Sequence, residues 1–135
     1  SRHFNRRTDG YGGSFENRAR LWLEILGAMR QAVKGAAAIA NRFSIDQLSG
    51  PQGIEVADEG LAFVELVARH GLVDLWDVNI SSLQEWGEDA GPSRFYKTNH
   101  QAPWTREVKK VAKVPVVVKS SDGVSEGSST YSQYA

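Results

Sequence analysis

Stretches of helical periodicity alternate with short apolar runs along this chain, and that order restricts the folds open to it. The expected elements are helices at 15–34, 54–70 and 101–113, with strands at 36–43, 72–81 and 114–118. Short apolar runs bounded by glycine or polar residues are typical of buried strands. The alternation therefore predicts an α/β fold with parallel strands and right-handed helical crossovers.

The first expected helix carries an apolar stripe formed by Trp22, Ile25, Leu26, Met29 and Val33. Residues at this spacing share one face of a helix, which indicates a helix that packs one side onto a core. Ser14 precedes the helix and is suited to cap its N-terminus, because its hydroxyl can accept a hydrogen bond from a free amide. Gly35 supplies the stop at the other end.

Length and composition limit what the chain can be. Its 135 residues suffice for one small domain, whereas a whole eight-stranded β/α barrel takes about 250 residues. Residues 1–118 form the expected domain. Residues 119–135 are rich in serine and glycine and hold too few apolar side chains to offset the entropy of ordering them, so we expect a disordered tail. The only methionine is Met29, so we expect a fragment.

Charge and cysteine content exclude several kinds of partner. Sixteen basic and sixteen acidic residues cancel, so no net field attracts nucleic acid or anionic lipid. No apolar run is long enough to span a membrane. Cysteine is absent and the histidines His3, His70 and His100 are scattered, so we expect no disulfide, iron–sulfur cluster or metal site. The expected location is the cytoplasm.

Three motifs together carry a resemblance to a known family. They are RTDGYGGSFENR at 7–18, IANRF at 39–43 and EWGEDAGPSRF at 85–95. The chain resembles the FMN-dependent old yellow enzyme family of NADH:flavin oxidoreductases over about residues 4–118, and is most similar to its trimethylamine and dimethylamine dehydrogenase branch. The family fold is a (β/α)8 barrel, so the resemblance implies about three consecutive parallel β/α units of such a barrel.

Arg42 is the candidate cofactor-binding residue. We place it at the C-terminal end of its strand, where parallel folds bind ligands. By resemblance it contacts the pyrimidine edge of FMN, where a fixed positive charge favours the reduced cofactor. The alternative from the residues alone is a surface arginine paired with Asp46.

Trp86 and Asp89 lie in a loop of about 83–100, which is longer than most connections. The resemblance makes Trp86 one wall of an aromatic pocket for a substrate amine, since an aromatic face attracts an alkylammonium group. It makes Asp89 a catalytic carboxylate of the same site. The alternative is a tryptophan packed on the rim of the barrel and a solvated aspartate.

The RTDGYGGSFENR motif has a mainly structural interpretation. Its adjacent glycines permit a tight turn into a capped helix. We expect Asp9, Tyr11, Asn17 and Arg18 to tie this loop to neighbouring units, without a catalytic role.

The resemblance implies a fragment of an FMN-dependent oxidoreductase that oxidises an N-methyl carbon of a small amine. The family's catalytic tyrosine and histidine precede residue 1. Lys119-Ser120-Ser121 also departs from the family's phosphate-binding segment, so we expect no FMN binding by this chain alone. The alternatives are a fragment of an ene-reductase that uses NAD(P)H, or a non-catalytic truncated α/β piece. Open sheet edges also predict self-association.

Overall fold

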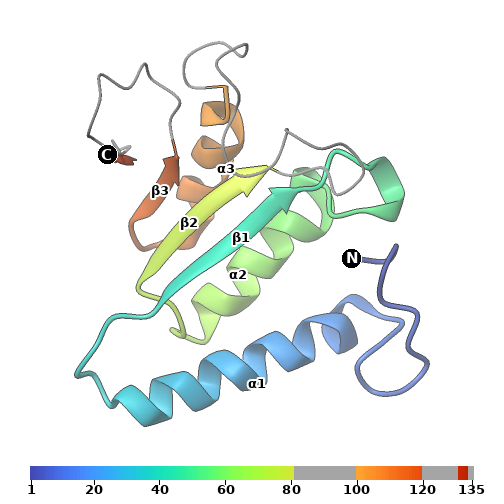
Figure 1. The fold of residues 1–135 in the computed structure, drawn as a ribbon, viewed down its shortest axis with the longest axis horizontal. Helices are drawn as coiled ribbons and strands as arrows, with labels where there is room; N and C mark the ends of the chain where they lie inside the picture. Colours follow the sequence, from blue (N-terminus) through green and yellow to red (C-terminus); the bar gives the residue numbers. More distant parts are fainter. Residues whose placement is uncertain (81–99, 120–130, 134–135) are drawn as a thin grey trace.

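The computed structural model describes residues 1–80, 100–119 and 131–133. Its centre is a sheet in which β1 (Ala40–Asp46), β2 (Leu75–Ile80) and β3 (Val116–Lys119) lie side by side and parallel (Figure 1). The predicted α/β arrangement of three parallel units is confirmed. A fourth short strand, β4 (Tyr131–Gln133), pairs antiparallel with β3, so these three residues of the expected disordered tail extend the sheet.

The three expected helices form, and the first and third begin and end within one residue of their expected bounds, whereas the second begins at Leu61, seven residues after its expected start. They are α1 (Phe15–Val33), α2 (Leu61–Arg69) and α3 (Ala102–Ala112), with a 3-10 turn η1 (Gly50–Gln52) and a π-helical turn η2 (Val56–Gly60) ahead of α2. Ser14 caps α1 as predicted, because its Oγ accepts a hydrogen bond of 3.3 Å from the amide of Asn17. Lys34 then ends α1 in the left-handed conformation.

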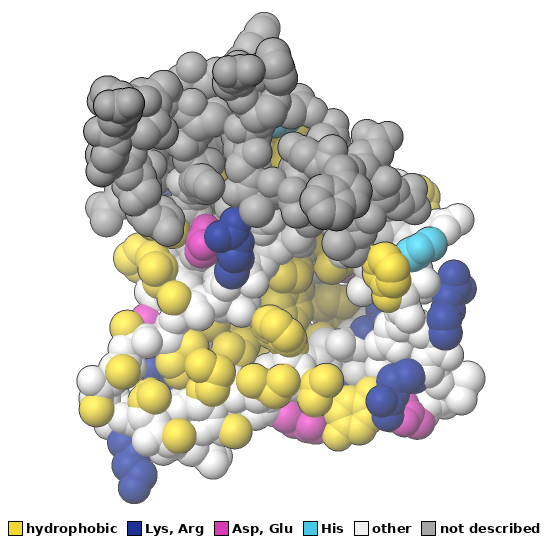
Figure 2. All heavy atoms as spheres, in the orientation of Figure 1, with side chains coloured by type: hydrophobic (Ala, Val, Ile, Leu, Met, Phe, Trp, Pro, Cys, Tyr) yellow, Lys and Arg dark blue, Asp and Glu magenta, His cyan; other side chains and the backbone are white. Residues whose placement is uncertain are grey.

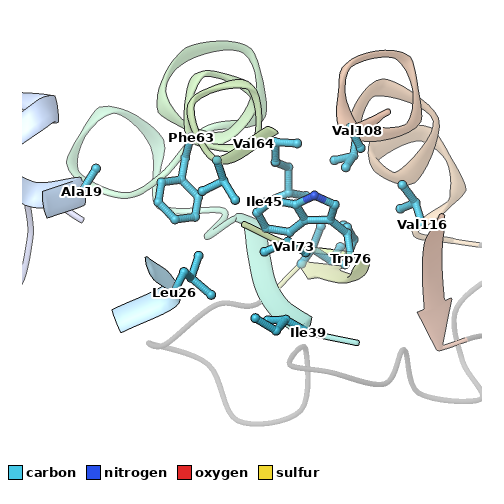
Figure 3. Packing of buried hydrophobic residues seen from close by; sticks show 14 residues of the cluster. Ala19, Leu26, Ile39, Ile45, Phe63, Val64, Val73, Trp76, Val108 and Val116 are labelled. Atoms are coloured by element: carbon cyan, nitrogen blue, oxygen red, sulfur yellow. The ribbon is translucent and has the colours of Figure 1, made fainter. Parts of the chain in front are cut away.

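The core lies between the sheet and the two helices α2 and α3. Trp76 of β2 is fully buried at its centre, with Phe63 and Val64 of α2 on one side and Val108 of α3 on another (Figure 3). The ring centroids of Phe63 and Trp76 lie 6.2 Å apart in an edge-on arrangement, which is favourable for aromatic pairs. One face of the sheet is thus covered by helices.

Gly60 allows the start of α2 to approach β1 closely. A Cβ atom at this position would lie 2.4 Å from the carbonyl oxygen of Ile45. Only glycine fits such an approach of one backbone to another. The contact fixes the η2 turn against the second half of β1.

The apolar stripe of α1 is covered less than its spacing predicts. Leu26 is buried, but Trp22, Ile25 and Met29 are each more than 40% exposed. α1 runs beside the sheet at the β1 edge rather than across its helix-covered face (Figure 1), and hydrophobic side chains gather along it (Figure 2). Only part of its apolar face therefore reaches other described residues.

Asp74 ties the end of α1 to the start of two strands. Its Oδ2 accepts a hydrogen bond of 2.8 Å from the amide of Ile39 and lies 2.9 Å from a guanidinium nitrogen of Arg30 in the last turn of α1. The Arg30 side chain, followed by the Ile39 amide, holds the pKa of Asp74 below its ordinary value. Folding therefore favours the ionised form of the Asp74 side chain over its protonated form.

This contact predicts an acid dependence of stability. A carboxyl group whose pKa is lower in the folded state stabilises fully above its unfolded pKa of about 3.9, and the contribution is lost as pH falls through the folded pKa. Asp74→Asn is therefore expected to make the free energy of unfolding fall less steeply below about pH 4. Urea unfolding followed by circular dichroism at several pH values measures this slope.

Arg30→Met is the matched variant for that measurement, because it removes the same interaction from the other side. It should flatten the acid dependence in the same direction as Asp74→Asn. The remaining slope includes Asp9, whose pKa the Arg7 guanidinium lowers to about 2. A slope unchanged in both variants would contradict the assigned role of Asp74.

Candidate functional site

Arg42 is the third of seven residues in β1. The expectation that it ends its strand was wrong, because β1 continues past Phe43 and its later residues Ser44 and Asp46 pair with β2. Side chains alternate between the two faces of a strand. Since Phe43 packs toward Phe63 of α2, Arg42 projects on the face opposite the helices.

Asp77 of β2 stands directly beside Arg42. The two residues are register partners in the parallel pair β1–β2. Nη1 of Arg42 lies 3.3 Å from Oδ2 of Asp77, and the side chains are 48% and 19% exposed. The structure thus places an ion pair on the uncovered face of the sheet, and the arginine half of it is accessible.

Asp46, the alternative partner of Arg42, is committed to other contacts. Its Oδ1 accepts a hydrogen bond from the amide of Leu48, while its Oδ2 accepts from the amide of Val56 and from Nε1 of Trp104. These bonds join the end of β1 to η2 and α3. Asp46 therefore organises the loop after β1, which the sequence alone did not reveal.

A cavity of about 320 Å³ opens along the edge of β1 and includes Arg42 in its wall. Most of its lining is apolar and comes from α1, β1 and α2, through Phe15, Ala19, Trp22, Phe43 and Phe63. Within the described part of the chain, β1 has a strand neighbour on one side only. The cavity therefore lies at the edge of β1 that pairs with no other described strand, and α1 forms its opposite wall.

Glu59 supplies a buried charge to this cavity, which sequence reasoning did not single out. Its carboxylate pairs with Arg18, and both side chains are only 9% exposed. A guanidinium nitrogen of Arg2 lies 2.7 Å from the same oxygen. Arg18 also donates to the carbonyl of Gly13. The pair between Arg18 and Glu59 thus connects the RTDGYGGSFENR loop to η2, as expected of Arg18.

Three other polar residues of that motif act locally instead. Asp9 pairs with Arg7 and accepts from the amide of Tyr11. The Tyr11 hydroxyl donates to Glu24 of α1, and Asn17 accepts from Arg20. Their expected ties to more distant units are not what the structure shows, because each finds a partner within the loop or α1. The loop is braced mainly against its own helix.

Trp86 and Asp89 both lie outside the described residues, in the range 81–99. The structure therefore gives no position for either relative to Arg42, and their roles stay predictions. The chain is described again from His100, whose ring centroid lies 5.8 Å from that of Trp104 in α3.

In residues 1–80, 100–119 and 131–133, no group of three histidine or acidic side chains is placed to hold a metal ion. None of the helices within those ranges combines the length and apolar character that crossing a bilayer requires.

The fold and the candidate site together indicate the class of protein to which the chain belongs. Consecutive parallel β/α units with helices on one face of the sheet are typical of (β/α)-barrel proteins. The model of the NADH:flavin oxidoreductase / NADH oxidase family matches residues 1–126. The chain belongs to this family of flavin oxidoreductases.

Individual relatives include amine-oxidising enzymes. Dimethylamine dehydrogenase from Hyphomicrobium sp. (strain x) is 50% identical over 115 residues, which are 85% of this chain and 15% of the relative. The structure of histamine dehydrogenase from Rhizobium sp. 4-9 is 38% identical with a TM-score of 0.70, over 83% of this chain and 15% of that one. The chain thus spans about a sixth of the length of these relatives.

A third similar protein is the 6-hydroxypseudooxynicotine amine oxidase from Pseudomonas geniculata N1. Its structure is 40% identical with a TM-score of 0.72, over 84% of this chain and 16% of that chain.

Proposed function

We propose that this chain is a segment of a longer FMN-dependent dehydrogenase that oxidises an N-methyl carbon of a small secondary or tertiary amine. The observation that carries the proposal is the placement of Arg42, half exposed on the uncovered face of the sheet in a chain that belongs to a flavin oxidoreductase family. The 50% identity to a dimethylamine dehydrogenase favours an amine over an enone as the substrate.

Arg42 fits the pyrimidine edge of a flavin. That edge gains negative charge when the cofactor is reduced, and a guanidinium presents several fixed donors to such an edge. The bound flavin would supply an electron acceptor that no protein side chain provides. Arg42 binds and orients this edge. We assign no residue of the chain to the FMN phosphate, because Lys119 and the residues after it depart from the family pattern.

Trp86 and Asp89 complete the proposed site on the substrate side. Trp86 would form one wall of the amine pocket and attract the alkylammonium group, a contact worth up to about 2 kcal/mol when water is excluded. Asp89 would belong to the polar set that controls the protonation of the bound amine. Both assignments rest on the EWGEDAGPSRF motif.

A hybrid enzyme tests this function. The 115 matched residues of the Hyphomicrobium dimethylamine dehydrogenase are replaced by those of this chain. The hybrid is expected to retain flavin after desalting and to oxidise dimethylamine with an artificial electron acceptor. Trp86→Ala is expected to raise KM about 30-fold, the equivalent of 2 kcal/mol. Asp89→Asn is expected to lower kcat about a hundredfold.

Two outcomes would contradict the proposal. One is a hybrid that assembles without flavin or without amine oxidation, whereas the parent enzyme made in parallel shows both. The other is a hybrid that does not fold, because a segment belonging at this place in the barrel must complete it. Phe4→Ala, which alters a side chain 59% exposed in the structure, serves as the control and should leave KM and kcat unchanged.

A further inference from the structure

Asp77 is an exception in its own strand. It lies in the run Leu75–Ile80, whose other residues are mostly buried and apolar. A carboxylate is rarely placed beside such residues unless it is paired. Its register partner across the β1–β2 pair is Arg42, 35 residues earlier in the chain. The pair is thus created by the parallel register rather than by closeness in sequence.

The two oxygens of Asp77 have different surroundings. Oδ2 accepts a hydrogen bond of 3.3 Å from Nη1 of Arg42. Oδ1 is buried and, within the described structure, has no hydrogen-bond partner. A carboxylate in this setting depends on the adjacent positive charge to offset its loss of water. Asp77 and Arg42 are therefore energetically coupled.

Asp77 and Arg42 differ in how far their side chains are exposed, and this difference suggests a separate role for each. Asp77 is 19% exposed and sits in the sheet, whereas the Arg42 side chain is 48% exposed and borders the cavity. Asp77, the less exposed member, can act as a fixed anchor, and Arg42, the more exposed member, can meet a ligand. An arginine side chain has several rotatable bonds, so an anchor reduces the conformations from which it must bind.

We propose that Asp77 is a positioning residue, which holds the guanidinium of Arg42 in the direction needed to contact the pyrimidine edge of the flavin. This inference rests on the proposed function. Asp77 does not itself touch the cofactor in this scheme. It acts through Arg42 by supplying a hydrogen-bond acceptor at a fixed place on the neighbouring strand.

Positioning and simple charge make opposite predictions for the flavin potential. If Asp77 acted only as a nearby negative charge, its removal would favour the negatively charged reduced flavin and raise the midpoint potential. If Asp77 holds Arg42 in place, its removal takes away this anchoring contact, the reduced flavin loses a stabilising interaction with the displaced guanidinium, and the potential falls. The sign of the shift therefore distinguishes the two roles.

The experiment measures the midpoint potential of the flavin in the FMN-loaded hybrid enzyme and its variants. Asp77→Leu is expected to lower the affinity for reduced relative to oxidised flavin at least tenfold, which is about 30 mV for a two-electron couple. Asp77→Asn retains an acceptor and should not lower the potential. The effect of Asp77→Leu should disappear in a variant that also carries Arg42→Met. If Asp77→Leu does not fold, Asp77→Thr replaces it.

Asp74→Asn is the matched control, because this carboxylate precedes the same strand but pairs with Arg30. It should leave the potential unchanged. A potential that rises or stays constant in Asp77→Leu, or falls equally without Arg42, would overturn the positioning role while the proposed function stands. Failure of the proposed function is recognised separately, since the unmodified hybrid would then hold no flavin.

Discussion

Replacing Trp76 with alanine is expected to reduce the free energy of unfolding by about 3–5 kcal/mol, the usual cost of removing a fully buried aromatic side chain. Trp76 has no exposed surface and packs among residues from β1, α2 and α3 (Figure 3). A small domain has a total stability of only about 5–15 kcal/mol. The variant should therefore unfold at much lower urea concentration, which circular dichroism measures without relying on tryptophan fluorescence.

Trp22→Ala is the control for this measurement. It removes the same side chain from α1, where the tryptophan is 41% exposed, and should cost about 1 kcal/mol or less. Trp76→Phe keeps an aromatic ring near Phe43 and Phe63 and should recover more than half of the loss. Equal losses for Trp22→Ala and Trp76→Ala would contradict the assignment of the core to the face covered by α2 and α3.

The order and type of the elements could be predicted from sequence because local patterns determine them. Helical spacing and the Ser14 cap identified α1, and short apolar runs identified the strands. The bounds of β1 were shifted, from 36–43 to Ala40–Asp46, because the strand continues through polar residues. The polar residues Ser44 and Asp46 belong to the sheet because they pair with β2. No local sequence pattern reveals this pairing.

The candidate site could be predicted only in part, because strand pairing also determines which of its residues meet. Arg42 could be singled out from its motif, but its partner Asp77 requires the β1–β2 register. The available signal was a charged residue within an apolar strand. Glu59 gave a weaker signal, since an acidic residue near the start of a helix is ordinarily explained by the helix dipole. Its burial with Arg18 appears only once α1 and η2 are placed together.

A double-mutant cycle on Arg18 and Glu59 is expected to give a large coupling energy, because removing one member of a buried ion pair leaves an uncompensated charge. Glu59→Leu should cost about 3–5 kcal/mol. Arg18→Met should cost less, since Arg2 remains 2.7 Å from the Glu59 carboxylate. The double variant should lose far less than the sum, as measured by urea unfolding. The exposed pair Glu107–Lys110 is the control and should show almost no coupling. Additivity within about 0.5 kcal/mol for Arg18 and Glu59 would show that the pair does not join the motif to η2 energetically.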